Sequence, residues 1–244
     1  MKAAASAQIR LLDLQAEDTA IAQLEHRKVA LPEHGVIVEG KQKRLSLAAS
    51  LVETRTKVSD FQIEVEKAET DLVPVRERLA RDIKRRDDGV VVDPRGMAAL
   101  NDEIEHLEKR ISDLEDAELE AMENLETTTS EQARLAEELT ELENSVRSVM
   151  ASRDEQLRGF DAEIQTHKEI RQQIVDELPA DLVALYTRIL GKNGGLAAVA
   201  LTGRRCAGCQ LEATAAALAE YTAAAEDEVL RCEECERILV RVTR

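Results

Sequence analysis

The sequence predicts a mainly α fold, in which a long antiparallel coiled-coil hairpin precedes a small C-terminal β module. Charged residues make up 34% of the 244 residues and aromatic residues only 2%, with Trp absent. This composition is typical of long helices and unsuited to a large globular core. Apolar residues also recur with a heptad period over most of the chain, and that period stops before a C-terminal segment that holds all four cysteines.

The first predicted element is a separate helix over residues 3–30. Pro32, Gly35 and Gly40 interrupt the periodicity after it, because proline removes a helical hydrogen bond and clashes with the preceding turn. We therefore expect an irregular stretch at these positions. In an antiparallel arrangement, the N-terminal helix should lie beside residues 153–180.

Two long apolar seams follow, and each predicts one arm of the hairpin. The first runs from Leu47 to Leu79, and the second lies in a helix predicted over residues 97–177. Residues 87–96 are rich in turn formers and place the tip of the hairpin there. Pro74 predicts a kink or a break in the first arm. The second seam comprises Leu100, Ile104, Leu107, Ile111, Leu114, Ala121, Leu125, Leu135, Leu139, Leu142, Val146, Val149, Phe160, Ile170 and Ile174.

The heptads stop at Leu178-Pro179. We therefore predict a hairpin domain over residues 1–178 and a C-terminal domain over residues 179–244. The C-terminal domain should contain a short amphipathic helix around residues 182–189, a small apolar run at Leu196–Leu201, and two β-like runs around Glu228–Arg231 and Ile238–Val242.

The cysteines form two C-x-x-C pairs, Cys206-Ala-Gly-Cys209 and Cys232-Glu-Glu-Cys235. Each pair can wrap a knuckle with two thiolates pointing inward, and two knuckles complete the tetrahedral sulfur sphere that Zn²⁺ prefers. With no histidine nearby, the site should be closed, so we expect one structural zinc ion per chain in a zinc ribbon. Redox use of the thiols is the competing interpretation, but the βαβ pattern of a thioredoxin-type enzyme is missing. Gly208 is expected to supply a left-handed backbone conformation in the first knuckle.

The sequence carries no P-loop, G-x-G-x-x-G, H-E-x-x-H or G-x-S-x-G motif. We therefore expect no enzyme and no small-molecule substrate. Arg10 and Asp13 interrupt the segment that a signal peptide would need to be apolar, and no apolar run approaches the ~20 residues of a membrane span. These features predict a cytoplasmic protein without membrane contact, in which thiols bind metal in preference to forming disulfides.

The formal net charge of −16 is unevenly distributed, with 16 acidic against 4 basic residues in the segment 98–150. An acidic surface suits a basic protein partner, so a protein-binding adaptor or chaperone is the first functional hypothesis, with the strand edges or Leu196–Leu201 as the docking surface. The alternative is an RNA-binding or ribonucleoprotein-binding regulator, against which the scarcity of aromatic side chains counts. A homodimer through the hairpin stays open. The candidate partner-binding residues are basic: Arg204, Arg205 and Arg237 near the cysteines, and Arg81, Lys84, Arg85 and Arg86 near the tip.

Several C-terminal motifs resemble those of the bacterial C4-type zinc ribbon proteins with an N-terminal coiled-coil hairpin, also described as CdsZ-like zinc ribbon regulatory proteins. The motifs are Leu185-Tyr186-Thr187-Arg188-Ile189, Gly194-Gly195, C-A-G-C, and C-E-E-C followed by Arg237-Ile238-Leu239. The resemblance implies four zinc-ligating cysteines and a regulatory or chaperone-like role, and one branch looks like a flagellar regulator that contacts RNA and a sigma factor. Family members usually carry Gly after the fourth cysteine and a proline-containing helix between the pairs, where this chain has Glu236 and Ala213–Ala225.

Overall fold

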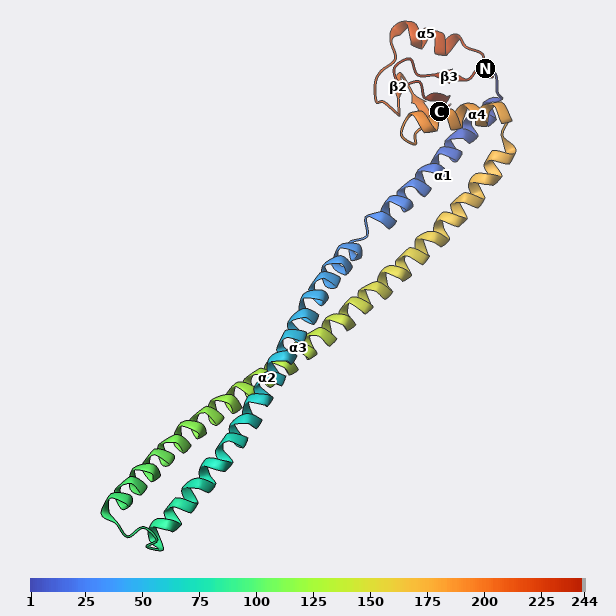
Figure 1. Cartoon of the computed structure of the whole chain (residues 1–244). Coiled ribbons are helices and arrows are strands. Elements are labelled where there is room, and N and C mark those ends of the chain that lie inside the picture. The colour runs from blue at the N-terminus through green and yellow to red at the C-terminus, as the bar shows by residue number, and fades with distance from the viewer. Residues whose placement is uncertain (243–244) are drawn as a thin grey trace. The chain divides into compact units, whose positions relative to one another are not determined.

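A computed structural model describes residues 1–242 and confirms the mainly α fold with a long helical hairpin and a small C-terminal sheet (Figure 1). Contacts divide the chain into two compact units. The sheet unit comprises Met1–His34 and the chain from Met150 onward, and the hairpin unit comprises Gly35–Val149. The predicted domain boundary between residues 178 and 179 stays a prediction. The elements in chain order are α1 (Ala5–Val29), α2 (Glu33–Asp87), α3 (Pro94–Glu177), α4 (Ala180–Lys192), β1 (Ala198–Thr202), β2 (Arg205–Cys206), α5 (Ala215–Ala223), β3 (Leu230–Arg231) and β4 (Ile238–Arg241).

In the hairpin unit, α2 and α3 lie side by side in opposite directions and bury a narrow apolar seam (Figure 1). Arg76 pairs with Glu115 at 2.6 Å and Arg44 pairs with Glu143 at 3.2 Å, which shows the register of the two arms. At the tip, the Asp93 carboxylate accepts hydrogen bonds from the backbone N–H of Arg95 and Gly96, so it satisfies two free donors at the start of α3. The buried seam residues of this unit include Ile37, Leu51, Leu72, Leu100, Ile104, Leu107, Ala121 and Leu135.

The irregular stretch expected up to Gly40 is wrong, because α2 already begins at Glu33 and continues through Gly35 and Gly40. Gly40 is buried, and a Cβ at this position would collide with the side chain of Val146. The glycine therefore permits close approach of α3 and does not end the helix. The break considered at Pro74 is also absent, since α2 runs through it to Asp87.

In the sheet unit, α1 packs against the C-terminal part of α3, where Leu24, Phe160 and Ile164 form a small core. Ile170 was predicted on this seam, but it is 39% exposed. From Phe160 to Leu178 the inward positions are 160, 164, 167, 171, 174 and 178, which keep the seven-residue period, but every second one lies one residue beyond the predicted position. The inward position consequently moves from Ile170 to its neighbour Arg171.

The sheet has the strand order β2-β1-β4-β3, with β1 parallel to β4 and the two edge strands antiparallel to their neighbours. One face, through Ala198, Ile238 and Val240, packs on α1, α3 and α4. The other face, through Val199 and Leu239, packs on α5 and the cysteines. Since Leu196–Leu201 contributes the central strand β1, with Ala197, Ala198 and Val199 buried, the prediction that this run is a docking surface is wrong.

Among residues 1–242, no helix combines the length and the apolar character that crossing a membrane requires.

Candidate metal centre

The two C-x-x-C pairs form two knuckles with the same backbone geometry, Cys206–Gln210 and Cys232–Glu236. In each knuckle, the carbonyl oxygen of the first cysteine accepts a hydrogen bond of 2.9 Å from the N–H of the last residue, Gln210 or Glu236. Both last residues have left-handed backbone angles, with φ of 63° and 60°. The N–H of each first cysteine, in turn, donates to the carbonyl oxygen of the residue after the knuckle. These hydrogen bonds, which both knuckles share, turn the two thiols of each pair to the same side.

The prediction that Gly208 supplies the left-handed conformation of the first knuckle is therefore wrong, because the left-handed residue is Gln210. Gly208 meets a different requirement. A Cβ on Gly208 would lie 2.8 Å from Cδ of Arg237 and 3.1 Å from Cγ1 of Val199. Glycine is needed at this position because the knuckle passes closely over the sheet.

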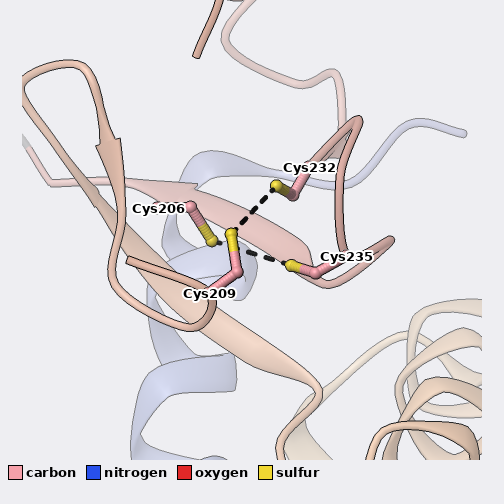
Figure 2. A group of neighbouring side chains, drawn as sticks. All are labelled: Cys206, Cys209, Cys232 and Cys235. Atoms are coloured by element: carbon pink, nitrogen blue, oxygen red, sulfur yellow. Dashed lines mark hydrogen bonds between the residues drawn. The ribbon is translucent and has the colours of Figure 1, made fainter. Parts of the chain in front are cut away.

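The four sulfur atoms meet between the knuckles, and Figure 2 shows the thiols of both pairs pointing toward one another. All four Sγ atoms lie within 4.8 Å of one another. The Sγ atoms of Cys206 and Cys235 are 3.8 Å apart, as are those of Cys209 and Cys232 (Figure 2). A tetrahedral ion with metal–sulfur bonds of about 2.3 Å requires sulfur atoms about 3.8 Å apart. The donor set and its spacing thus fit a tetrahedral thiolate-bound metal ion.

Burial and hydrogen bonding act in opposite directions on these thiols. Burial raises the pKa of Cys206, and it raises the pKa of Cys232 to about 12. Burial acts in the same direction on Cys235, but hydrogen bonds from the backbone N–H of Arg237 and from the Cys232 thiol outweigh it and lower the pKa of Cys235 to about 7. Several thiolates this close together repel one another unless a cation lies between them.

Arg237, a predicted partner-binding residue, contributes to the framework of the site. Its guanidinium donates to the carbonyl oxygens of Leu196, at 2.9 Å, and Asn193, at 3.3 Å. The Asn193 side chain in turn donates to the carbonyl oxygen of Cys235 at 3.3 Å. These bonds attach the second knuckle to the loop between α4 and β1. The guanidinium of Arg237 therefore makes its hydrogen bonds within the protein.

The short helix α5 covers the second knuckle from the other side. Its N-cap residue Thr214 accepts a hydrogen bond from the N–H of Ala217 and donates its own N–H to the Glu233 carboxylate. The Tyr221 hydroxyl donates to the carbonyl oxygen of Arg231 and accepts from the N–H of Glu233. The alanine-rich stretch Ala213–Ala225 therefore contains the helix α5, which covers the second knuckle and has no proline.

Two glutamines of α1 bind backbone groups of the sheet unit, Gln15 at the start of β1 and Gln8 at the N-terminal segment and the loop before β3, and sequence reasoning missed both. Gln15 is buried, and its Oε1 accepts from the N–H of Ala197 at 2.6 Å and of Ala198 at 3.2 Å, while its Nε2 donates to the carbonyl oxygen of Gly195. Gln8 is also buried and donates to the carbonyl oxygens of Ala3 and Glu226. Their positions on the same helix face as Leu11 and Leu14 were a usable signal, because polar groups on an apolar face need buried partners.

The remaining predicted partner-binding residues lie in two separate places. Arg204 and Arg205 are exposed beside the first knuckle, and Arg205 pairs loosely with Glu212 at 3.8 Å. At the hairpin tip, three arginines have acidic neighbours within their own helix: Arg81 with Glu77, Arg85 with Asp82, and Arg86 with Asp87. Lys84 is exposed. The structure therefore shows exposed cations in both units and brings only Arg204, Arg205 and Arg237 near the cysteines.

These features define the class: a coiled-coil hairpin protein with a C-terminal sheet that carries a four-cysteine cluster. The chain belongs to the CT398-like coiled-coil hairpin domain family, whose model matches residues 14–194. The matched region ends before the cysteines.

Relatives match over nearly the full length. The uncharacterised protein Rv2229c of Mycobacterium tuberculosis is 31% identical over 242 residues, which cover 99% of this chain and 98% of that protein. A solved structure from Mycobacterium smegmatis is also 31% identical, with a TM-score of 0.81 over 99% of this chain and 100% of that chain. CT398 from Chlamydia trachomatis shares the fold, with a TM-score of 0.68 at 18% identity over 97% and 98% of the two chains. No enzyme name appears among these relatives.

Proposed function

We propose that this protein is a non-enzymatic regulatory adaptor, in which Cys206, Cys209, Cys232 and Cys235 hold one structural Zn²⁺ and the zinc ribbon binds a protein partner. The observation that carries the proposal is the sulfur cluster, with two equivalent knuckles and cross-pair sulfur distances of 3.8 Å. When bound, the ion would crosslink the two knuckles and give a closed site with all four positions filled by sulfur. Such a site stabilises structure and leaves no position for a substrate.

The chemistry of the donor set favours zinc. Four thiolates at tetrahedral spacing select zinc or iron–sulfur chemistry and disfavour Mg²⁺ and Ca²⁺, which prefer oxygen ligands. Thiolates persist as ligands in a reducing compartment, so the proposal places the protein in the cytoplasm.

The exposed surface beside the first knuckle is the proposed partner-binding surface. Arg204 and Arg205 are exposed there, whereas the outer edge of β2 is already bridged by residues 211–213 within the chain. The two arginine side chains are therefore the feature available to a partner, and their positive charge favours an acidic segment of it. A protein partner is favoured over RNA because the basic residues are few and the arginines of the tip already have acidic neighbours.

Affinity capture with the full-length, zinc-loaded chain tests this function. We expect one protein to be recovered in stoichiometric amount after nuclease treatment. The R204E/R205E double variant should lose it, whereas Arg188→Glu, an exposed arginine on α4, should retain it. Equal recovery with the native protein, R204E/R205E and Arg188→Glu would show that the partner does not bind at Arg204 and Arg205.

A gel shift with total cellular RNA tests the alternative. Retarded RNA at physiological salt that disappears when Arg81, Lys84, Arg85 and Arg86 are replaced by Gln would favour an RNA-binding regulator and count against the protein adaptor.

A further inference from the structure

An apolar stripe lies on the outside of the hairpin unit, beside the buried seam of α3. Leu119 is 58% exposed and Met122 is 48% exposed. Met122 follows the seam residue Ala121, and Leu119 lies one helical turn before Met122, at positions where a coiled coil normally carries polar residues. Two large apolar side chains at solvent-facing positions are not needed to hold the two arms together.

The stripe forms one wall of a groove. It continues along α3 through Glu126, Thr129 and Ala133, at helical steps of four, three and four residues, and Val65 of α2 contributes to the groove from the other arm. The groove has a volume of about 690 Å³. From Leu119 to Ala133 it extends over about 21 Å at 1.5 Å per residue, which matches about four turns of a helix.

The walls of this groove carry a strong negative charge. The α3 segment 111–133 holds eight acidic residues and no basic residue, and the α2 segment 58–72 opposite it holds five acidic residues and one lysine. Glu123 and Glu126 belong to the lining itself. Within residues 1–242, neither of these two carboxylates has an ion-pair partner, although Glu115 and Glu131 nearby are paired with arginines.

We propose that this groove binds a basic amphipathic helix of a protein partner. An apolar stripe with spacing of three and four residues is complementary to the apolar face of a helix. Unpaired carboxylates along the rim are complementary to lysine and arginine on the flanks of that helix. The proposal deepens the proposed function, because it assumes that the protein is a partner-binding adaptor and assigns a second, distinct binding surface with its own chemistry.

A second copy of this chain is the less favourable occupant. Both walls of the groove are net negative. Two grooves facing each other would place these carboxylates side by side, and like charges at an interface disfavour association. A basic helix gains from the same charges.

A designed peptide provides the probe. A helix of about 18 residues made of Leu, Lys and Ala, with the leucines on one face, spans the groove. We expect it to bind the full-length, zinc-loaded protein in fluorescence anisotropy. A peptide with the same composition in scrambled order and a peptide with Glu in place of every Lys are the controls, and both should bind at least about tenfold more weakly, since each lacks one of the two complementary features. Equal affinity for either control would overturn the proposal.

Met122 reports the place of binding. The chain has four methionines, and they are at positions 1, 97, 122 and 150. With ¹³C-labelled methionine methyl groups, the NMR signal of Met122 should shift on addition of the basic peptide while the signals of Met1, Met97 and Met150 stay unchanged. A Met122 signal that does not move at saturation would contradict binding in the groove.

A matched pair of double variants distinguishes binding in the groove from nonspecific binding to exposed apolar side chains. L119S/M122S should weaken peptide binding at least about tenfold, because the apolar contacts are lost. V52S/V73S removes two α2 side chains that are equally exposed, at 61% and 55%, and lie outside the groove lining, so it should bind as the native protein does. If both doubles behave alike, the groove is not the site. If instead the native protein forms dimers in sedimentation equilibrium that L119S/M122S abolishes, the groove belongs to a second copy and the proposal is wrong.

The outcome can be told apart from that of the proposed function. The peptide should bind equally well to the native protein and to Cys232→Ser, because the groove lies in the hairpin unit and the cysteines lie in the sheet unit. Failure of the peptide experiment with successful capture through Arg204 and Arg205 would overturn the groove and leave the adaptor function intact.

Discussion

The hairpin unit and the sheet unit reach stability by opposite means. In the hairpin unit, the same small contact between leucine, isoleucine and alanine side chains recurs along two helices, with exposed ion pairs such as Arg76–Glu115 between the arms. In the sheet unit, a compact apolar core is combined with single hydrogen bonds between residues far apart in sequence, such as that from the N–H of Ala197 to Gln15. Repetition distributes stability over many residues, whereas unique contacts concentrate it in a few.

The largest expected difference between the units concerns the proposed zinc ion. Removing it with a chelator, or replacing Cys232 with Ser, should release both knuckles, because a structural zinc supplies on the order of 10 kcal/mol to the folding of small zinc modules. We expect the amides of Gln210 and Glu236 to exchange with solvent as in an unfolded chain, while the helicity measured by far-UV circular dichroism stays nearly constant. The amide of Ala198 should keep its protection, since Gln15 holds it. A global loss of helix would show that the two units do not differ in this way.

A charge in the hairpin seam is expected to have the next largest effect. Leu107 is 4% exposed, and Leu107→Glu buries an unpaired carboxylate, so it should lower the free energy of unfolding by about 4 kcal/mol. Denaturation by guanidinium, followed by circular dichroism, measures the loss. Val73→Glu, at a position 55% exposed on the same hairpin, should change stability by less than about 0.5 kcal/mol. Similar losses in both variants would mean that the seam is misassigned.

These predictions rest on parts of the fold that the sequence determines to different degrees. The hairpin could be predicted because its periodicity repeats many times and the turn residues at 87–96 interrupt it once. The exchange of Ile170 for Arg171 was missed because residues 170 and 171 are neighbours at the edge of the same helix face, and the apolar pattern alone selects the isoleucine. Gly40 was misread because a local rule about helix breakers contains no information on Val146, which it contacts across the hairpin.

In the candidate site, the cysteines could be predicted from their spacing, but their support could not. The parallel pairing of β1 with β4, which places Ala198 beside Ile238, joins residues far apart in the chain and leaves no local signal. The hydrogen bonds of Arg237 to Leu196 and Asn193 depend on that pairing, so a residue predicted to face a partner belongs to the framework.

Loss of one hydrogen-bonding side chain should destabilise the sheet unit by an intermediate amount. Gln15→Leu leaves the buried N–H groups of Ala197 and Ala198 without an acceptor, at a cost of about 2–3 kcal/mol. Thermal unfolding and hydrogen exchange at β1 measure the change. The control is Gln23→Leu, an exposed glutamine on the same helix, which should leave both unchanged. Equal stability of the two variants would show that the Gln15 side chain does not stabilise the sheet unit.

The smallest expected effect is a gain. Glu236 has a φ of 60°, a conformation that costs a residue with a Cβ about 1–2 kcal/mol relative to glycine. Glu236→Gly should therefore stabilise the metal-bound protein by about 0.5–1 kcal/mol, after the loss of the exposed pair with Arg231. Glu234→Gly, in the same knuckle without a positive φ, should be neutral or destabilising. The order of the two midpoints in thermal unfolding decides the matter, and a lower midpoint for Glu236→Gly would argue against strain at this turn.

The central claim is that the four cysteines hold one zinc ion that folds the knuckles. Its most direct test is metal analysis of the full chain, purified under reducing conditions without added metal, together with a count of reactive thiols. We predict one zinc per chain, thiols that react only after denaturation or chelation, and no zinc in Cys232→Ser. A native protein with four reduced, reactive thiols and no bound metal would contradict the claim.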